Sequence, residues 1–318
     1  MAVNAFIFPG QGSQAVGMGR DLAASFAAAR HVFEEVDEVL KQKLTKLMFE
    51  GPADELTLTE NAQPALMAVS LAVLRVLQTE GGLNLKDKIA LVAGHSLGEY
   101  SALAAVESFS VTEAAKLLKL RGQAMQKAVA PGVGAMAALL GVELALAQDV
   151  CIEAQALMQG GETVSVANDN GGGQVVISGH KIAVEQAMEI AKGKGVKRAM
   201  LLPVSAPFHC ALMAPAADAM AEAFDKTPPR TPILPIIANV TAAKVTAPAQ
   251  IRDLLVQQVT ATVRWRESID EMVKLGVTHF YEIGAGKVLS GLVKRIAPDA
   301  TATATSTPAE IEALLKVL

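Results

Sequence analysis

Apolar residues follow two different spacings along the chain, and each spacing marks one kind of predicted element. Short, wholly apolar runs at residues 3–8 and 89–93 predict strands buried on both faces, as in a parallel sheet. Residues 236–239 and 279–283 predict further strands. Residues 48–56 indicate a loop, and residues 300–305 form a tail segment of alternating alanine and threonine. Helical spacing predicts helices at residues 21–40, 63–79, 99–106, 111–129, 212–224, 251–259, 265–275 and 288–295. This alternation predicts an α/β layered core.

The middle of the chain, residues 131–203, follows a different order of elements. Its pattern predicts strand, helix, strand, strand, helix and strand, which is the order of the ferredoxin-like unit. Pro131 and Pro203 bracket the segment, as expected where a chain crosses between two bodies. We therefore predict an inserted ferredoxin-like α+β subdomain. Residues 1–130 and 204–318 would form the larger part, a hydrolase-like α/β core with a mostly parallel sheet.

Composition narrows the class of protein. Of 318 residues, 51% are hydrophobic and 19% are charged, which is typical of a globular protein. The net charge of −4 shows no basic excess of the kind that nucleic-acid binding needs. The longest apolar stretch, residues 65–77, contains Arg75 and is too short for a membrane span. Cys151 and Cys210 fit no metal motif, and the N-terminus has no basic region of a signal peptide, so we expect reduced thiols and a cytoplasmic protein.

One serine has the local sequence of a catalytic nucleophile. Residues 94–98, Gly94-His-Ser-Leu-Gly98, match the Gly-x-Ser-x-Gly nucleophile elbow, with a predicted strand before them and a predicted helix after them. A turn this sharp requires minimal side chains on both sides of Ser96, and the N–H of Leu97 would face a developing oxyanion. The alternative is a tight turn in which Ser96 only caps the helix. The strand–turn–helix context favours the nucleophile.

A serine nucleophile needs a general base, and the best-placed histidine is His209. The chain has five histidines, namely His31, His95, His180, His209 and His279. His209 lies in the loop where the chain returns from the predicted insert to the core, and such junction loops line clefts. The acidic residues Asp149 and Asp169, between serine and histidine, both fall inside the insert. A backbone carbonyl is the alternative group that would orient the imidazole.

Four motifs, in this order, carry a resemblance to a known family. They are Phe8-Pro-Gly-Gln-Gly-Ser-Gln14, Gly94-His-Ser-Leu-Gly-Glu-Tyr100, Ala206-Pro-Phe-His209 and Glu282-Ile-Gly-Ala-Gly-Lys-Val288. The chain resembles, over essentially its whole length, the malonyl-CoA:acyl carrier protein transacylases of fatty-acid synthesis and the related acyltransferase domains of polyketide synthases. One motif departs from the family pattern, because Ala285 replaces the proline of its usual Gly-Pro-Gly turn.

The resemblance implies a role for each matching residue. Ser96 would be the nucleophile, His209 the base, and the N–H groups of Gln11 and Leu97 the oxyanion hole. Arg121 would bind the substrate carboxylate, although an exposed helix arginine is the plain alternative. Gln258 would line the site, and its region would supply the carbonyl that orients the histidine. Phe208 would narrow the pocket and so disfavour methylmalonyl groups. The remaining implied substrate contacts are Asn168, Asn170 and His95.

The implied activity is a ping-pong transfer of malonyl from malonyl-CoA to the phosphopantetheine thiol of acyl carrier protein, through an ester on Ser96. A guanidinium at Arg121 would bind the malonyl carboxylate bidentately and would be left unpaired by acetyl-CoA. The expected partners are malonyl-CoA and the carrier, with no metal or redox cofactor, no nucleic acid and no membrane. We expect a monomer.

Other readings of the sequence remain open at this point. The same elbow occurs in serine esterases and thioesterases, and a regulatory protein that only binds CoA would not need Ser96. Residues 10–15 loosely fit a dinucleotide-binding turn, but Glu34 and Glu35 fall in a helical pattern instead of ending a second strand. Four basic residues are candidates for docking an acidic carrier, although a solvated basic face is the favoured reading; they are Lys192, Lys194, Lys197 and Arg198.

Overall fold

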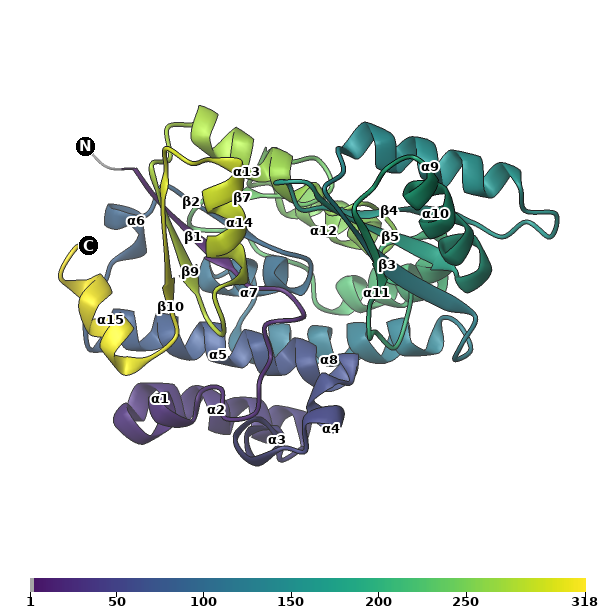
Figure 1. Ribbon diagram of the computed structural model, residues 1–318. Helices are drawn as coiled ribbons and strands as arrows, with labels where there is room; N and C mark the ends of the chain where they lie inside the picture. Colours follow the sequence, from purple (N-terminus) through teal and green to yellow (C-terminus); the bar gives the residue numbers. More distant parts are fainter. Residues whose placement is uncertain (1–2) are drawn as a thin grey trace.

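The computed structural model describes residues 3–318 and contains two separate sheets (Figure 1). The larger sheet has six strands in the order β10-β9-β1-β2-β7-β8, and every neighbouring pair is parallel except β7 with β8. Its strands are β1 (Asn4–Phe8), β2 (Leu91–Gly94), β7 (Ile236–Ile237), β8 (Lys244–Val245), β9 (His279–Ile283) and β10 (Thr301–Thr305). The prediction of an α/β protein with a mostly parallel sheet is confirmed.

Helices cover both faces of this sheet because its central strands are apolar on both sides. Phe6 and Phe8 of β1 pack into the core on one face, against helices that include α5 (Thr59–Thr79) and α8 (Val111–Lys127). Ala5 and Ile7 pack on the other face, against α13 (Trp265–Lys274) and α14 (Val288–Ile296). The other helices of this part are α1 (Arg20–Ser25), α2 (Ala27–Leu40), α3 (Leu44–Glu50), α4 (Ala53–Thr57), α6 (Leu85–Lys88), α7 (Leu97–Ala105), α11 (Ala214–Lys226), α12 (Pro248–Gln258) and α15 (Pro308–Leu315).

The smaller sheet is antiparallel and lies beside the larger one in Figure 1. Its strand order is β4-β5-β3-β6, and an apolar cluster of its own packs beneath α9 and α10. The elements, in chain order, are β3 (Gly134–Leu140), α9 (Leu144–Ala156), β4 (Val164–Asp169), β5 (Gln174–His180), α10 (Lys181–Gly193) and β6 (Arg198–Leu201). This is the order of elements that the sequence predicts for residues 131–203.

Three local predictions are wrong. The single helix predicted at residues 21–40 is two helices, because Phe26 adopts extended backbone (φ −130°) between α1 and α2. The loop predicted at residues 48–56 contains the end of α3 and most of α4, which are too short to show helical spacing. The tail segment at residues 300–305 is the edge strand β10, paired in parallel with β9. Its threonines favour a strand because their β-branched side chains fit a pleated surface.

Helix α5 is apolar and long enough, by length and composition alone, to cross a membrane. In this fold 83% of its most apolar window is buried inside the protein, which is typical of the core helix of a globular domain. The helix packs against α2 and α8, so its apolar surface is covered by the protein itself. Cys151 and Cys210 are both free and buried.

Candidate active site

The nucleophile elbow lies at the carboxyl end of β2, where the chain turns directly into α7. Ser96 has a strained backbone (φ 54°, ψ −111°), and the flanking glycines make this turn sterically possible. A Cβ on Gly94 would lie 1.9 Å from the carbonyl oxygen of Gly98, and a Cβ on Gly98 would lie 2.3 Å from that of Phe8. No side chain fits at either position, so the turn depends on both glycines.

Asn239 holds this turn from the neighbouring strand. Its side-chain oxygen accepts a hydrogen bond from the Ser96 N–H at 2.8 Å, and its amide nitrogen donates to the Gly94 carbonyl at 2.7 Å. Asn239 follows β7, which lies beside β2 in the sheet, so the two carboxyl ends meet at one edge. Sequence reasoning missed Asn239. The available signal was a polar residue at the end of a predicted strand.

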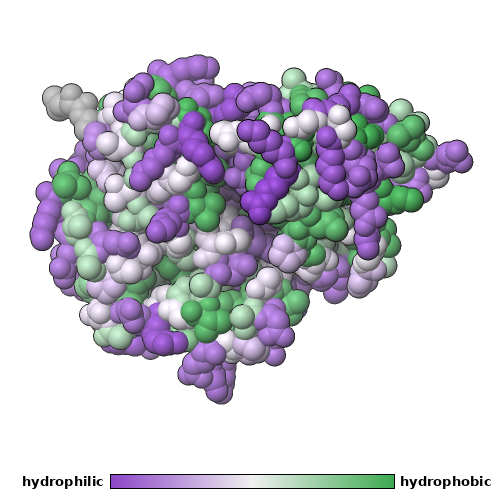
Figure 2. All heavy atoms as spheres, in the orientation of Figure 1, coloured by the Kyte–Doolittle hydropathy of each residue, from purple (hydrophilic) through white to green (hydrophobic). Residues whose placement is uncertain are grey.

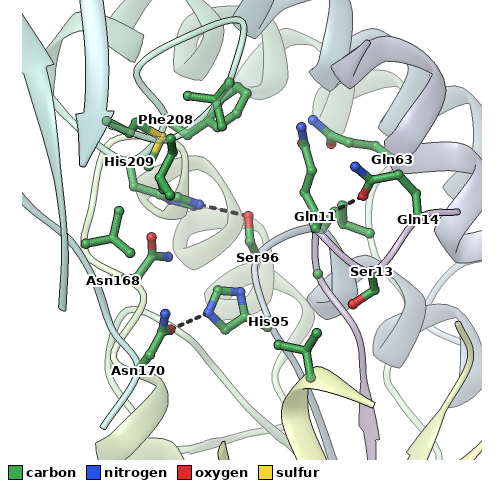
Figure 3. A pocket seen from close by; sticks show the side chains of 18 of the residues that line it. Gln11, Ser13, Gln14, Gln63, His95, Ser96, Asn168, Asn170, Phe208 and His209 are labelled. Atoms are coloured by element: carbon green, nitrogen blue, oxygen red, sulfur yellow. Dashed lines mark hydrogen bonds between the residues drawn. The ribbon is translucent and has the colours of Figure 1, made fainter. Parts of the chain in front are cut away.

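Ser96 and His209 form a hydrogen-bonded pair (Figure 3). The Ser96 Oγ lies 2.8 Å from His209 Nε2, and His209 Nδ1 lies 2.8 Å from the carbonyl oxygen of Gln258. A carbonyl only accepts, so Nδ1 carries the proton and Nε2 is free to accept from serine. Burial, and then the positive charge of Arg121, lower the pKa of His209 to about 3. The imidazole is therefore neutral, as a base must be.

No carboxylate contacts this histidine among the described residues. Asp169 is buried near the cleft, but its carboxylate bonds to Arg266 at 2.9 Å. The backbone carbonyl that the sequence left as the alternative is the group that orients His209, and it belongs to Gln258 itself.

Arg121 projects from α8 into the same site and is only 1% exposed. Its guanidinium donates to Gln63 Oε1 and to Gln258 Oε1, each at 2.8 Å, and to Ser96 Oγ at 3.2 Å. The plain alternative of an exposed helix arginine is thus wrong. Within the described part of the chain, no carboxylate forms a direct ion pair with Arg121, although unpaired buried cations are costly. The guanidinium is placed to bind an anion beside Ser96.

Gln258 lies behind Arg121 and does not line the cleft. Its side-chain nitrogen donates to Glu99 Oε2 at 2.6 Å and to the Ser96 carbonyl at 3.0 Å. Glu99 is buried, and this burial raises the pKa of its carboxyl to about 7. Sequence analysis named Gln258 but missed Glu99, and it also missed Gln63 on α5. The sequence signals for Glu99 were its place in the motif at residues 94–100 and its spacing of three residues after the serine, one helical turn along α7.

A cleft of about 570 Å³ opens in front of these residues, between the two sheets. Figure 2 shows this face of the molecule hollowed near its centre. The cleft is lined by residues of both parts, and the predicted site residues among them are Gln11, His95, Ser96, Leu97, Arg121, Asn168, Asn170, Phe208 and His209. Its apolar wall is formed by Met125, Met136, Val176, Leu202 and Val204. The ten predicted site residues are therefore together, nine in the cleft and Gln258 directly behind it.

The other cleft residues have definite surroundings. His95 Nε2 bonds to Asn170 Oδ1 at 2.9 Å, and the two side chains face each other in Figure 3. Burial lowers the pKa of His95, so this ring is neutral as well. Gln11 follows β1, and its side-chain oxygen accepts from Thr59 at 3.0 Å. Asn168 and Phe208 both stand in the cleft wall.

The structure bears on two further interpretations of the sequence. The turn at residues 10–15 does not open a helix, because α1 begins only at Arg20, so the dinucleotide-binding reading is not supported. Lys192 and Lys194 pair with Glu189 and Glu153, and neither lysine lines the cleft. In residues 3–318 no group of three or more histidine, cysteine, aspartate or glutamate side chains is placed to hold a metal ion.

A strained serine, a neutral histidine and a fixed guanidinium at the carboxyl edge of a parallel sheet define a site for covalent acyl transfer. Comparison with known proteins agrees: residues 5–309 match the family described as acyl transferase domain, and the chain belongs to this family.

Similar proteins share a name. The chain is 46% identical to a malonyl CoA-acyl carrier protein transacylase of Escherichia coli strain K12, covering 98% of this chain and 99% of that protein. It is also 46% identical to the protein of that name in Bacillus subtilis strain 168, covering 100% and 98%. A solved acyl-carrier-protein S-malonyltransferase from Bartonella henselae superposes with a TM-score of 0.96 at 55% identity, covering 99% of each chain. A malonyl-transacylase solved with a type II PKS acyl-carrier protein superposes with a TM-score of 0.95 at 41% identity, covering 100% of each chain.

Proposed function

We propose that this protein transfers a malonyl group from malonyl-CoA to the phosphopantetheine thiol of an acyl carrier protein, through an ester on Ser96. The observation that carries the proposal is the position of Arg121. Its guanidinium lies 3.2 Å from the nucleophilic oxygen, inside the cleft, with no carboxylate of the described chain bonded to it. The relatives named above carry the same activity in their names.

The first half-reaction follows from the geometry of the pair. His209 Nε2 accepts the Ser96 proton as the serine oxygen attacks the thioester carbonyl of malonyl-CoA. The N–H groups of Gln11 and Leu97 would stabilise the resulting oxyanion. The C–S bond then breaks, the CoA sulfur takes the proton from His209, and malonyl remains as an ester on Ser96. The carrier thiol attacks this ester in the second half-reaction, with His209 again accepting and returning the proton.

Selection of the acyl group follows from charge and space. A guanidinium binds a carboxylate through two parallel hydrogen bonds and would hold the thioester against Ser96. Acetyl-CoA has no carboxylate and would leave the buried cation unpaired. Phe208, in the cleft wall, would crowd a methyl branch between the two carbonyl groups and so favour malonyl over methylmalonyl.

Several broader properties belong to the same proposal. The chain would divide into a hydrolase-like catalytic part, residues 1–130 and 204–318, and a ferredoxin-like subdomain, residues 131–203, as the two sheets and their separate apolar clusters support.

The site is complete within one chain, which supports a monomer. Every step above balances without a metal or redox cofactor. Free, buried cysteines fit a reducing compartment such as the cytoplasm.

The deciding experiment is intact-mass analysis after mixing with malonyl-CoA. Wild-type protein is expected to gain one malonyl group, and Ser96→Ala to gain none. Addition of holo acyl carrier protein should remove the group from the enzyme and add it to the carrier. A mass gain that persists in Ser96→Ala would refute the covalent mechanism. Loss of the acyl group to water at the same rate with and without carrier would indicate a thioesterase instead.

A further inference from the structure

Glu99 is a buried carboxylate that the mechanism above does not use. It lies on α7, one helical turn after Ser96, and is 3% exposed. One of its oxygens, Oε2, accepts from the Gln258 side-chain nitrogen at 2.6 Å and from the Asn239 N–H at 3.3 Å. No lysine or arginine forms a direct ion pair with Glu99 in the described residues. Burying an ionised carboxylate costs free energy of folding unless an opposite charge compensates it.

The compensating charge is Arg121, one amide group away. The Gln258 side-chain N–H donates a hydrogen bond to Glu99, and the Gln258 side-chain oxygen accepts one from Arg121 at 2.8 Å. An amide has one donor end and one acceptor end, so the carboxylate decides which end faces the guanidinium. With the Gln258 oxygen toward Arg121, the guanidinium is held beside Ser96. Glu99 and Arg121 are thus linked through one side chain, and each has the other as its opposite charge.

We propose that Glu99 is a positioning residue that serves as the resting counter-ion of Arg121 through Gln258, and that it takes up a proton from solvent when a substrate carboxylate replaces it. This inference rests on the proposed binding of a malonyl carboxylate at Arg121. Before substrate arrives, the ionised Glu99 holds the Gln258 amide in the orientation that keeps the guanidinium beside Ser96. Once malonyl is bound, two carboxylates compete for one guanidinium, and the buried one gives up its charge.

The titratable groups around Glu99 are consistent with this exchange. The pKa of Glu99 is raised to about 7, chiefly by burial, and the hydrogen bonds from Gln258 and Asn239, followed by the positive charge of Arg121, limit that rise. An opposite charge nearby lowers a carboxyl pKa, so neutralising Arg121 would raise the pKa of Glu99 further. The other groups facing this cluster do not titrate near pH 7: burial lowers the pKa of His95, lowers that of His209 to about 3, and raises that of Tyr100 far above neutrality.

The exchange predicts proton uptake that depends on the substrate carboxylate. Binding of malonyl-CoA to Ser96→Ala protein is measured by calorimetry at pH 8 in buffers of different ionisation enthalpy, which reports protons bound per site. We expect uptake on the order of half a proton with malonyl-CoA and none beyond the CoA background with acetyl-CoA, which is the matched ligand. Equal uptake for the two ligands would overturn the proposal without any variant at position 99.

The isosteric variant Glu99→Gln assigns the proton. The substituted side chain keeps an oxygen that can accept from Gln258 but has no charge to lose, so malonyl-linked uptake should vanish in Ser96→Ala/Glu99→Gln. Uptake that survives in this double variant belongs to a histidine and refutes the assignment to Glu99. Circular dichroism checks that the variant is folded; if it is not, the comparison of malonyl-CoA with acetyl-CoA decides alone.

A kinetic measurement on active enzyme gives an independent answer. Above pH 7, the ratio of kcat/KM for malonyl-CoA to that for acetyl-CoA should fall by up to about tenfold per pH unit, because the ionised Glu99 competes with the malonyl carboxylate. In Glu99→Gln that ratio should not change with pH, and a ratio that is flat in wild type contradicts the proposal. Failure of malonyl-CoA to acylate Ser96 at all would instead refute the proposed function.

Discussion

Replacing Arg121 by alanine tests the assignment of the acyl-group specificity most directly. The substitution removes the guanidinium that lies 3.2 Å from Ser96 Oγ, and with it the donors to Gln63 and Gln258. His209 keeps its orientation, because a backbone carbonyl holds it, and Ser96 Oγ loses the Arg121 donor but keeps its hydrogen bond to His209. We therefore expect loss of selectivity with retention of acyl transfer.

The expected size follows from the lost hydrogen bonds. Each hydrogen bond to a charged group contributes about 1.5–3 kcal/mol, so a bidentate pair with the malonyl carboxylate contributes roughly 3–6 kcal/mol. This corresponds to a decrease of about 10²–10⁴-fold in kcat/KM for malonyl-CoA. Acetyl-CoA makes no such pair, so its kcat/KM should change by less than about tenfold. The ratio of the two should fall accordingly.

The assay is the initial rate of acyl transfer to holo acyl carrier protein with each CoA ester in turn. Arg121→Lys is the matched control, because it keeps the charge but has no planar fork, and it should retain an intermediate selectivity. Circular dichroism shows whether each variant is folded. If Arg121→Ala still acylates Ser96 and prefers malonyl-CoA as strongly as wild type does, the guanidinium is not the carboxylate site.

Three further predictions concern the base, the turn and a distant ion pair. Because burial and Arg121 lower the pKa of His209 to about 3, its neutral form persists as pH falls; single-turnover acylation at saturating malonyl-CoA, where Glu99 no longer competes with the substrate carboxylate, should show no inflection near pH 6.5, and one there would contradict the assigned environment. Asn239→Ala removes both hydrogen bonds that hold the Ser96 turn, and should cost about 1–3 kcal/mol of unfolding free energy and at least tenfold in acylation rate; unchanged kinetics would show that the glycines alone maintain the turn. The Arg230 guanidinium lowers the pKa of Glu113 from 4.5 to about 2, so the pair stabilises the fold above pH 4.5 and this contribution is lost as pH falls toward 2; the stability difference between wild type and Glu113→Gln, measured by urea unfolding, should be present at pH 7 and disappear across that interval.

The local part of the site was predictable from the sequence. Gly94 and Gly98 are required because any Cβ there would collide with backbone, and that requirement shows in the residue types themselves. His209 was selected because it lies in a loop between two predicted bodies, and the structure brings it within 2.8 Å of the serine. Arg121 depended on the resemblance to a family, since its own sequence context is an ordinary helix.

The residues that hold the site in place were not predictable. Asn239, Glu99 and Gln63 contact Ser96, Gln258 and Arg121 across sequence separations of 143, 159 and 58 residues. Apart from the motif at residues 94–100, which contains Glu99, nothing local distinguishes them from other polar residues, because their importance comes from burial beside one another. The same reason explains β10, whose threonine-rich run becomes a strand only because β9 offers it a free edge.

By itself the sequence determined most of the strands and helices and the sharp serine turn, because these depend on side-chain periodicity and on local steric limits. Only the tertiary structure decided the geometry in which His209 meets Ser96, that the carbonyl behind the histidine belongs to Gln258 itself, and that a second charge, Glu99, lies one amide beyond Arg121. Those outcomes depend on where the carboxyl ends of β1, β2 and β7 come together. Contacts of that kind are created by packing the whole chain, since no single segment contains both partners.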